Sequence, residues 1–194
     1  MAGRVRDPLV GRDVLFGIIL GVVWTLLIEI MFLALQHIGA TPDLSSSEFF
    51  LGLRQVLGAC LAHLALSIQG ALGFFFLLFV FRVVLRKPWL AAIVFVAFWT
   101  GIKTYDNHHW MYVLPAYLML YSIAAFVILR FGFIALAVGI FTVDLLANLP
   151  VTTDFSSWYI GNSMFVYGLL TALAVWGCYS ALAGQKLVKE NLFE

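Results

Sequence analysis

Charged residues and cysteines are both scarce in this chain. Asp, Glu, Lys and Arg make up 11% of its 194 residues and hydrophobic residues 63%, whereas soluble proteins carry about a quarter charged residues. Together with a mean hydropathy of +1.03, this shortage of charge excludes a soluble globular protein and predicts an integral membrane protein. The net charge of +1 provides no basic surface, so we expect no nucleic-acid partner.

The two cysteines, Cys60 and Cys178, do not predict a disulfide. They fall near opposite ends of two different predicted helices, so their depths in a membrane differ by roughly 20 Å. A disulfide cannot span that distance. We expect two separate, buried thiols.

Sequence motifs of the common enzyme classes are missing as well. The chain contains no His-Glu-x-x-His zinc motif and no Gly-x-Ser-x-Gly nucleophile elbow. The segment Asp106-Asn107-His108-His109 holds potential metal ligands, but adjacent histidines in a loop fit tetrahedral zinc geometry poorly. We therefore expect no enzymatic activity, no catalytic residues, no cofactor and no metal site.

The apolar residues fall into stretches that suit helical membrane spans, each of which needs about 20 residues. The long apolar run 110–149 must cross twice, because one helix of that length would measure about 60 Å against a hydrocarbon core of about 30 Å. Arg130 marks the turn within it. The sequence therefore predicts an all-α fold, a polytopic bundle of six transmembrane helices forming one domain over residues 1–194. The predicted spans are about 14–38, 56–82, 88–103, 110–129, 131–149 and 161–183.

Lys and Arg residues concentrate in alternate gaps between these spans. Short loops rich in Lys and Arg stay on the cytoplasmic side of a membrane, so we expect both termini in the cytoplasm. Only Arg54 and Lys103 lie in the other gaps. The nine residues that set the pattern are Arg4, Arg6, Arg12, Arg82, Arg86, Lys87, Arg130, Lys186 and Lys189.

Three ionisable residues inside the predicted spans are the candidate site. Glu29, His63 and Asp144 all fall in the outer half of the bilayer under this topology, and ionisable groups at membrane depth are costly and often functional. The hypothesis is a polar pocket, open to the outside, in which His63 pairs with Glu29 or Asp144. Three alternatives stay open: the acids fix helix packing by pairing or hydrogen bonding, they lie near enough to the interface to stay hydrated, or they serve transport or a proton relay.

The segment Gly17-Ile18-Ile19-Leu20-Gly21 is a small-xxx-small pattern, which lets two helices approach closely. It fits packing within the bundle or a contact between two copies of the chain. Within one chain of six helices we expect the internal use.

Five segments are distinctive beyond their composition: 6–15, 86–91, 129–132, 149–159 and 179–184. Together they resemble the membrane-spanning C-terminal region of bacterial serine/threonine protein kinases, especially those of acidobacterial type. The resemblance covers nearly the whole chain and implies an inner-membrane location in a bacterium. No kinase catalytic motif is present, so the chain resembles the membrane portion alone, as a separate gene product or a fragment.

We therefore expect a non-enzymatic membrane anchor or signalling module, with the lipid bilayer and a kinase domain or other signalling protein as partners. The alternative function is a small transporter or channel subunit that uses the polar pocket. Water access to Glu29 from outside distinguishes the two, because only the transporter requires it.

Overall fold

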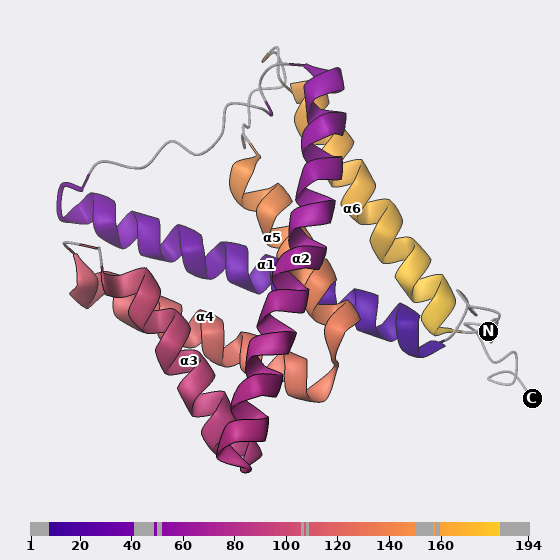
Figure 1. The fold of residues 1–194 in the computed structure, drawn as a ribbon. Helices are drawn as coiled ribbons and strands as arrows, with labels where there is room; N and C mark the ends of the chain where they lie inside the picture. Colours follow the sequence, from indigo (N-terminus) through magenta and orange to yellow (C-terminus); the bar gives the residue numbers. More distant parts are fainter. Residues whose placement is uncertain are drawn as a thin grey trace, which may run out of the picture.

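Six α-helices make up the fold. The computed structural model describes residues 8–40, 49, 52–105, 107, 109–149, 157 and 160–182, and no β-strand occurs among them. Five of the helices are long and apolar enough to cross a membrane, so the chain is an α-helical membrane bundle, as its composition predicts (Figure 1). In chain order the helices are α1 (Pro8–His37), α2 (Leu53–Leu85), α3 (Pro88–Tyr105), α4 (Trp110–Arg130), α5 (Phe133–Asn148) and α6 (Ile160–Ala181).

Local backbone features end α2 and begin α3 at a tight turn. Arg86 adopts a left-handed conformation with φ 56°, and its N–H donates to the carbonyl oxygen of Arg82. Pro88 then occupies the first position of α3, where a missing N–H costs nothing. The basic residues of this turn thus follow directly from the helix ends.

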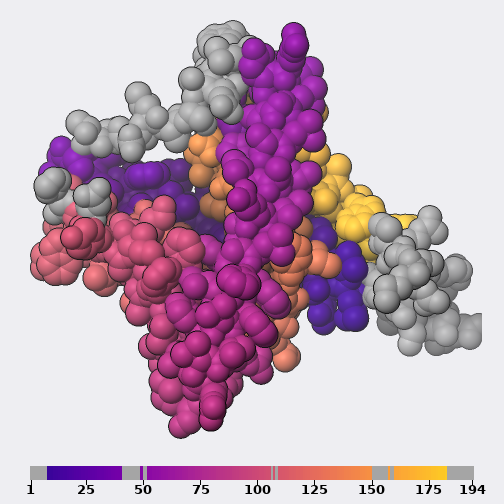
Figure 2. All heavy atoms as spheres, viewed as in Figure 1, coloured from indigo at the N-terminus to yellow at the C-terminus, as the bar shows by residue number. Residues whose placement is uncertain are grey.

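The helix α5 is shorter than the others. Its 16 residues span about 24 Å, less than the roughly 30 Å of a hydrocarbon core. It is also the central helix, because it packs against α1, α2 and α4, and in Figure 2 the atoms of α2 lie in front of part of it. Its buried residues are Ala135, Leu136, Gly139, Phe141, Thr142, Val143 and Leu145.

Glycines bring α1 against α5 and α6. A methyl group added at Gly17 would lie 2.7 Å from the carbonyl oxygen of Ala135, and one at Gly21 would overlap the side chain of Thr142. Near the start of α1, a methyl group at Gly11 would meet the backbone of α6 in the same way. The small-xxx-small pattern therefore serves packing within the chain, which confirms the prediction of internal use.

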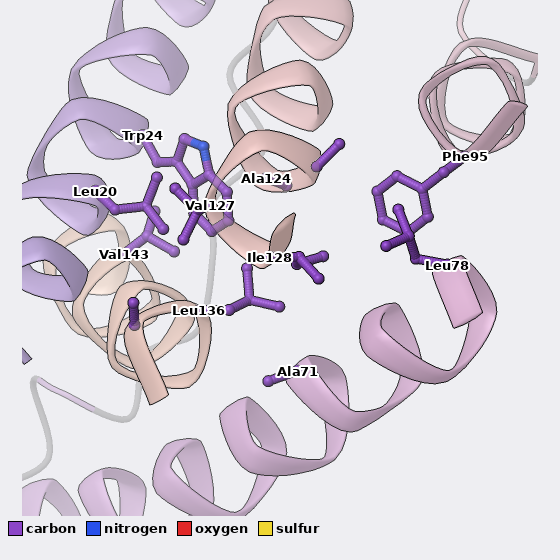
Figure 3. Packing of buried hydrophobic residues seen from close by; sticks show 12 residues of the cluster. Leu20, Trp24, Ala71, Leu78, Phe95, Ala124, Val127, Ile128, Leu136 and Val143 are labelled. Carbon is purple, nitrogen blue, oxygen red and sulfur yellow. The ribbon is translucent and has the colours of Figure 1, made fainter. Parts of the chain in front are cut away.

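The main apolar cluster gathers side chains from α1 to α5. Figure 3 shows Trp24 of α1 beside Val127 of α4, and Leu78 of α2 facing Phe95 of α3. A second cluster joins α2, α5 and α6 where α2 and α6 begin and α5 ends, which is the upper end in Figure 1. Its buried members are Phe49, Val56, Ala59, Cys60, Phe141, Leu145, Leu149, Val166 and Leu170.

The thiols of Cys60 and Cys178 are both free. Cys60 is buried in the second cluster, as predicted. Cys178 is exposed on α6, so the prediction of burial was wrong for this residue. An apolar sequence does not tell which side of a lipid-exposed helix faces the bundle.

Candidate functional site

His63 and Asp144 lie next to each other near the upper end of the bundle. His63 projects from α2 and Asp144 from α5, and His63 Nδ1 is 3.8 Å from Asp144 Oδ2. The separation suits an ion pair with a protonated imidazole but exceeds a hydrogen bond. Nδ1 is buried without a hydrogen-bond partner. The structure thus brings together two of the three candidate residues.

The pair occupies a largely apolar setting with one open side. The His63 side chain is 17% exposed and that of Asp144 34%. The ring of Phe49 stacks on the imidazole with centroids 6.0 Å apart and covers one face of it. Because a low dielectric strengthens the attraction between opposite charges, this setting favours a close contact between α2 and α5.

Two asparagines extend the polar region at this end of the bundle. Asn162, buried at the start of α6, donates a hydrogen bond of 2.9 Å to the carbonyl oxygen of Phe49. Asn148 donates one of 2.7 Å to the carbonyl oxygen of Asp144 in its own helix. Neither residue was identified from the sequence as part of the site. The feature that could have found Asn162 is a neutral amide within an apolar segment, because such amides form hydrogen bonds with other parts of a membrane bundle.

Glu29 lies apart from the pair. It is exposed on α1, and no ion pair or hydrogen bond joins it to any described residue. The cause is the direction of its side chain, because Glu29 belongs to the side of α1 turned away from Gly17 and Gly21, which pack against α5. The C-terminal part of α1, which carries Glu29, lies away from the start of α2 (Figure 1).

The chemistry available at the site follows from these contacts. An imidazole and a carboxylate can hold or exchange a proton and can attract each other when both are charged. Among the residues that the structure describes, no group of three or more His, Cys, Asp or Glu side chains could hold a metal ion. Asp106 and His108, which belong to the histidine-containing segment considered above, lie outside those residues.

An apolar groove, which neither His63 nor Asp144 lines, is a separate feature of the described part of the chain. Its volume is about 560 Å³, and it lies between α2, α5 and α6. Cys60 and Ser67 are its only lining residues with a polar side-chain atom, and the Ser67 hydroxyl is already donated to the carbonyl oxygen of Leu64. Such a groove accommodates hydrocarbon rather than an ion. The other lining residues are Leu57, Leu61, Leu64, Ile68, Phe133, Ile134, Ala137, Val138, Phe141, Phe165, Leu169 and Leu173.

Comparisons of the chain with models of protein families, with curated proteins and with solved structures find no match. Any function is therefore argued from the site.

Proposed function

We propose that the chain is a non-enzymatic membrane module that anchors a soluble signalling partner, and that the contact between His63 and Asp144 transmits a signal to it. One observation carries the proposal. Among the described residues, this is the only ion pair that joins two helices. It couples α2 and α5, whose opposite ends adjoin basic turns at the lower end of the bundle (Figure 1).

The two helices are suited to transmit a displacement. The 33 residues of α2 extend about 50 Å as one helix. The helix α2 ends at Leu85, directly before Arg86 and Lys87, and α5 begins at Phe133, three residues after Arg130. Because helices move as nearly rigid bodies, a shift between α2 and α5 at the pair would also shift these basic turns. The three cations then form the surface that a soluble partner meets.

The proposed orientation places these basic turns in the cytoplasm of a bacterium. Lys and Arg favour the inner side in short loops. The start of α1 and the end of α6 lie side by side, because Gly11 contacts Ala181 closely, and this neighbourhood supports an even number of crossings with both termini inside. The resemblance to kinase-linked membrane regions suggests a serine/threonine kinase domain or another signalling protein as the partner.

Photo-cross-linking in cells tests the anchor. A photoreactive residue replaces Lys87 at the lower end or, as a matched position, Asn107 between α3 and α4. We expect a soluble signalling protein to be cross-linked from position 87 and not from 107. The proposal fails if position 87 captures no such protein, or if both positions capture it equally.

A second arm tests whether the pair transmits the signal. Asp144→Asn removes the charge at the pair, and Asp13→Asn removes a charge that is paired with Arg12 on its own helix. We expect the yield of the signalling protein cross-linked from position 87 to change at least twofold in Asp144→Asn and to stay constant in Asp13→Asn. An unchanged yield in Asp144→Asn contradicts transmission through the pair.

A small transporter or channel subunit is the second candidate function. The observation that favours it is the exposure of the Asp144 carboxylate, which is one third open although it lies at membrane depth. Proteoliposomes that contain a pH-sensitive dye distinguish the two. Proton flux that depends on Asp144 supports transport, and absence of flux with intact cross-linking supports the anchor.

A further inference from the structure

One face of α1 is covered by no described part of the chain. Large apolar side chains line it at helical spacings of three and four residues, which place them on one side of the helix. Glu29 belongs to the same face, because it lies three residues after Leu26 and four before Leu33. We call this surface the free face of α1. Its apolar members and their exposures are Ile19 59%, Val22 41%, Val23 38%, Leu26 57%, Ile30 62% and Leu33 63%.

Glu29 lies within the membrane-spanning part of this face. The 30 residues of α1 measure about 45 Å, so in a helix centred on a hydrocarbon core of about 30 Å, Glu29 lies about 5 Å inside the core boundary. Its exposed neighbours on the free face, Leu26 and Leu33, are apolar, and the next exposed polar side chain toward the end of α1 is that of Gln36, seven residues on. A carboxyl group in lipid at this depth is costly, and such groups nearly always face a polar partner.

No described residue of the chain provides such a partner. The hydroxyl nearest along the helix, that of Thr25, donates to the carbonyl oxygen of Gly21. No described residue forms an ion pair or hydrogen bond with Glu29. The rest of α1 is occupied by contacts with α4, α5 and α6. The free face therefore carries an acidic side chain that has no described partner, next to a row of exposed apolar side chains. Such a surface is complementary to one side of a further transmembrane helix.

We propose that the free face of α1 docks a transmembrane helix of a different polypeptide, one that carries Lys or Arg near its middle and pairs it with Glu29. Charge complementarity selects this occupant. The described Lys and Arg residues of a second copy are poorly placed to pair with Glu29, because each lies outside a helix or within about one turn of a helix end. Those cations are Arg12, Arg54, Arg82, Arg86, Lys87, Lys103 and Arg130.

This docking surface is independent of the role proposed for His63 and Asp144. It lies on the side of α1 turned away from the glycine contacts with α5, and it needs no signal to pass between α2 and α5. A failed cross-link at Lys87 would leave it untouched.

A defined peptide tests the proposal in lipid vesicles. The full chain, labelled with a donor fluorophore at the exposed thiol of Cys178, is reconstituted with an acceptor-labelled polyleucine helix that carries one central Arg. The reference peptide is all leucine. Energy transfer measures association for the wild type, Glu29→Gln and Glu29→Leu, and for the matched control Gln69→Leu, which removes an exposed polar group from α2.

We expect the wild type to bind the Arg peptide about tenfold more tightly than the leucine peptide, in line with typical interhelical polar contacts. The preference should vanish in both Glu29 variants and persist in Gln69→Leu. Circular dichroism of each variant confirms that it is folded. Equal binding of the two peptides by the wild type overturns the proposal, as does a preference that survives in Glu29→Gln.

Self-association is the remaining outcome. Energy transfer between donor- and acceptor-labelled copies that disappears in Glu29→Leu would show that a second copy covers the free face. That result would overturn the proposed occupant. We expect instead that the labelled copies show no Glu29-dependent transfer.

Discussion

The side-chain amide of Asn162 donates a hydrogen bond of 2.9 Å to the carbonyl oxygen of Phe49. It links the start of α6 to a residue that precedes α2, and it lies in the same apolar cluster as Val56 and Val166. Phe49 in turn stacks on His63. This single contact therefore helps to position the residue on which the proposed function depends.

Loss of this hydrogen bond should destabilise the upper end of the bundle. Asn162→Leu leaves the buried carbonyl oxygen of Phe49 without its donor, and we expect the free energy of unfolding to fall by about 1–3 kcal/mol. Unfolding in mixed micelles, followed by circular dichroism, measures it. The control is Thr171→Ala, since the Thr171 hydroxyl is exposed and donates only within its own helix. A loss in Asn162→Leu no larger than in the control would contradict the assignment.

The attraction between His63 and Asp144 can be measured by a double-mutant cycle. His63→Leu and Asp144→Leu each leave the other side chain without its charged partner, so we expect each to destabilise the chain. Their double mutant should be more stable than the sum predicts by about 0.6–1.7 kcal/mol, the range measured for polar contacts between membrane helices. Strictly additive effects would show that the 3.8 Å approach contributes nothing to stability.

Close packing of α1 against α5 predicts a sharp difference between glycines. At Gly17 an alanine methyl group would lie 2.7 Å from the backbone oxygen of Ala135, so Gly17→Ala should cost about 1–3 kcal/mol through overpacking. At Gly168 no atom lies within 4 Å of such a methyl group, and Gly168→Ala should be neutral or stabilising by up to about 1 kcal/mol. Thermal unfolding of both variants compares them, and equal effects would argue against the close approach.

Orientation can be read from labelling of single cysteines. In a Cys60→Ala, Cys178→Ser background, Asn107→Cys should react with a membrane-impermeant maleimide on intact cells. Lys87→Cys should react only after the membrane is opened, because the positive-inside rule assigns its turn to the cytoplasm. The reverse pattern would place both termini outside and would remove the basis for a cytoplasmic partner at this turn.

The positions of the helices were largely predictable from the sequence. Apolar length and the turn residues Arg86, Pro88 and Arg130 mark where helices begin and end, because a chain in lipid must satisfy its backbone groups within each helix. The predicted 131–149 segment proved shorter, as α5. An apolar segment indicates that its residues are compatible with lipid or with burial in the bundle. It therefore does not distinguish a central helix from a peripheral one.

The candidate site was predictable only in part. The presence of His63 and Asp144 in neighbouring spans made a contact plausible, and the structure places them together. Glu29 has the same chemical signal and a similar depth, yet it faces away. The depth of a residue in the membrane follows from its position along the chain. The direction in which its side chain points depends on how its helix is rotated and on which helix packs against it.

Hydrophobicity and charge act locally along the chain, so the amino-acid sequence alone was enough to identify a helical membrane protein and the segments that form its helices. Which polar groups meet became clear only from the packed arrangement of the helices. The glycines of α1 bring one side of that helix against α5, which leaves Glu29 on the opposite, exposed side, while Asp144 of α5 lies next to His63. The physical reason is that helix rotation and crossing angle arise from packing between residues distant in the chain, and no local pattern of hydrophobicity specifies them.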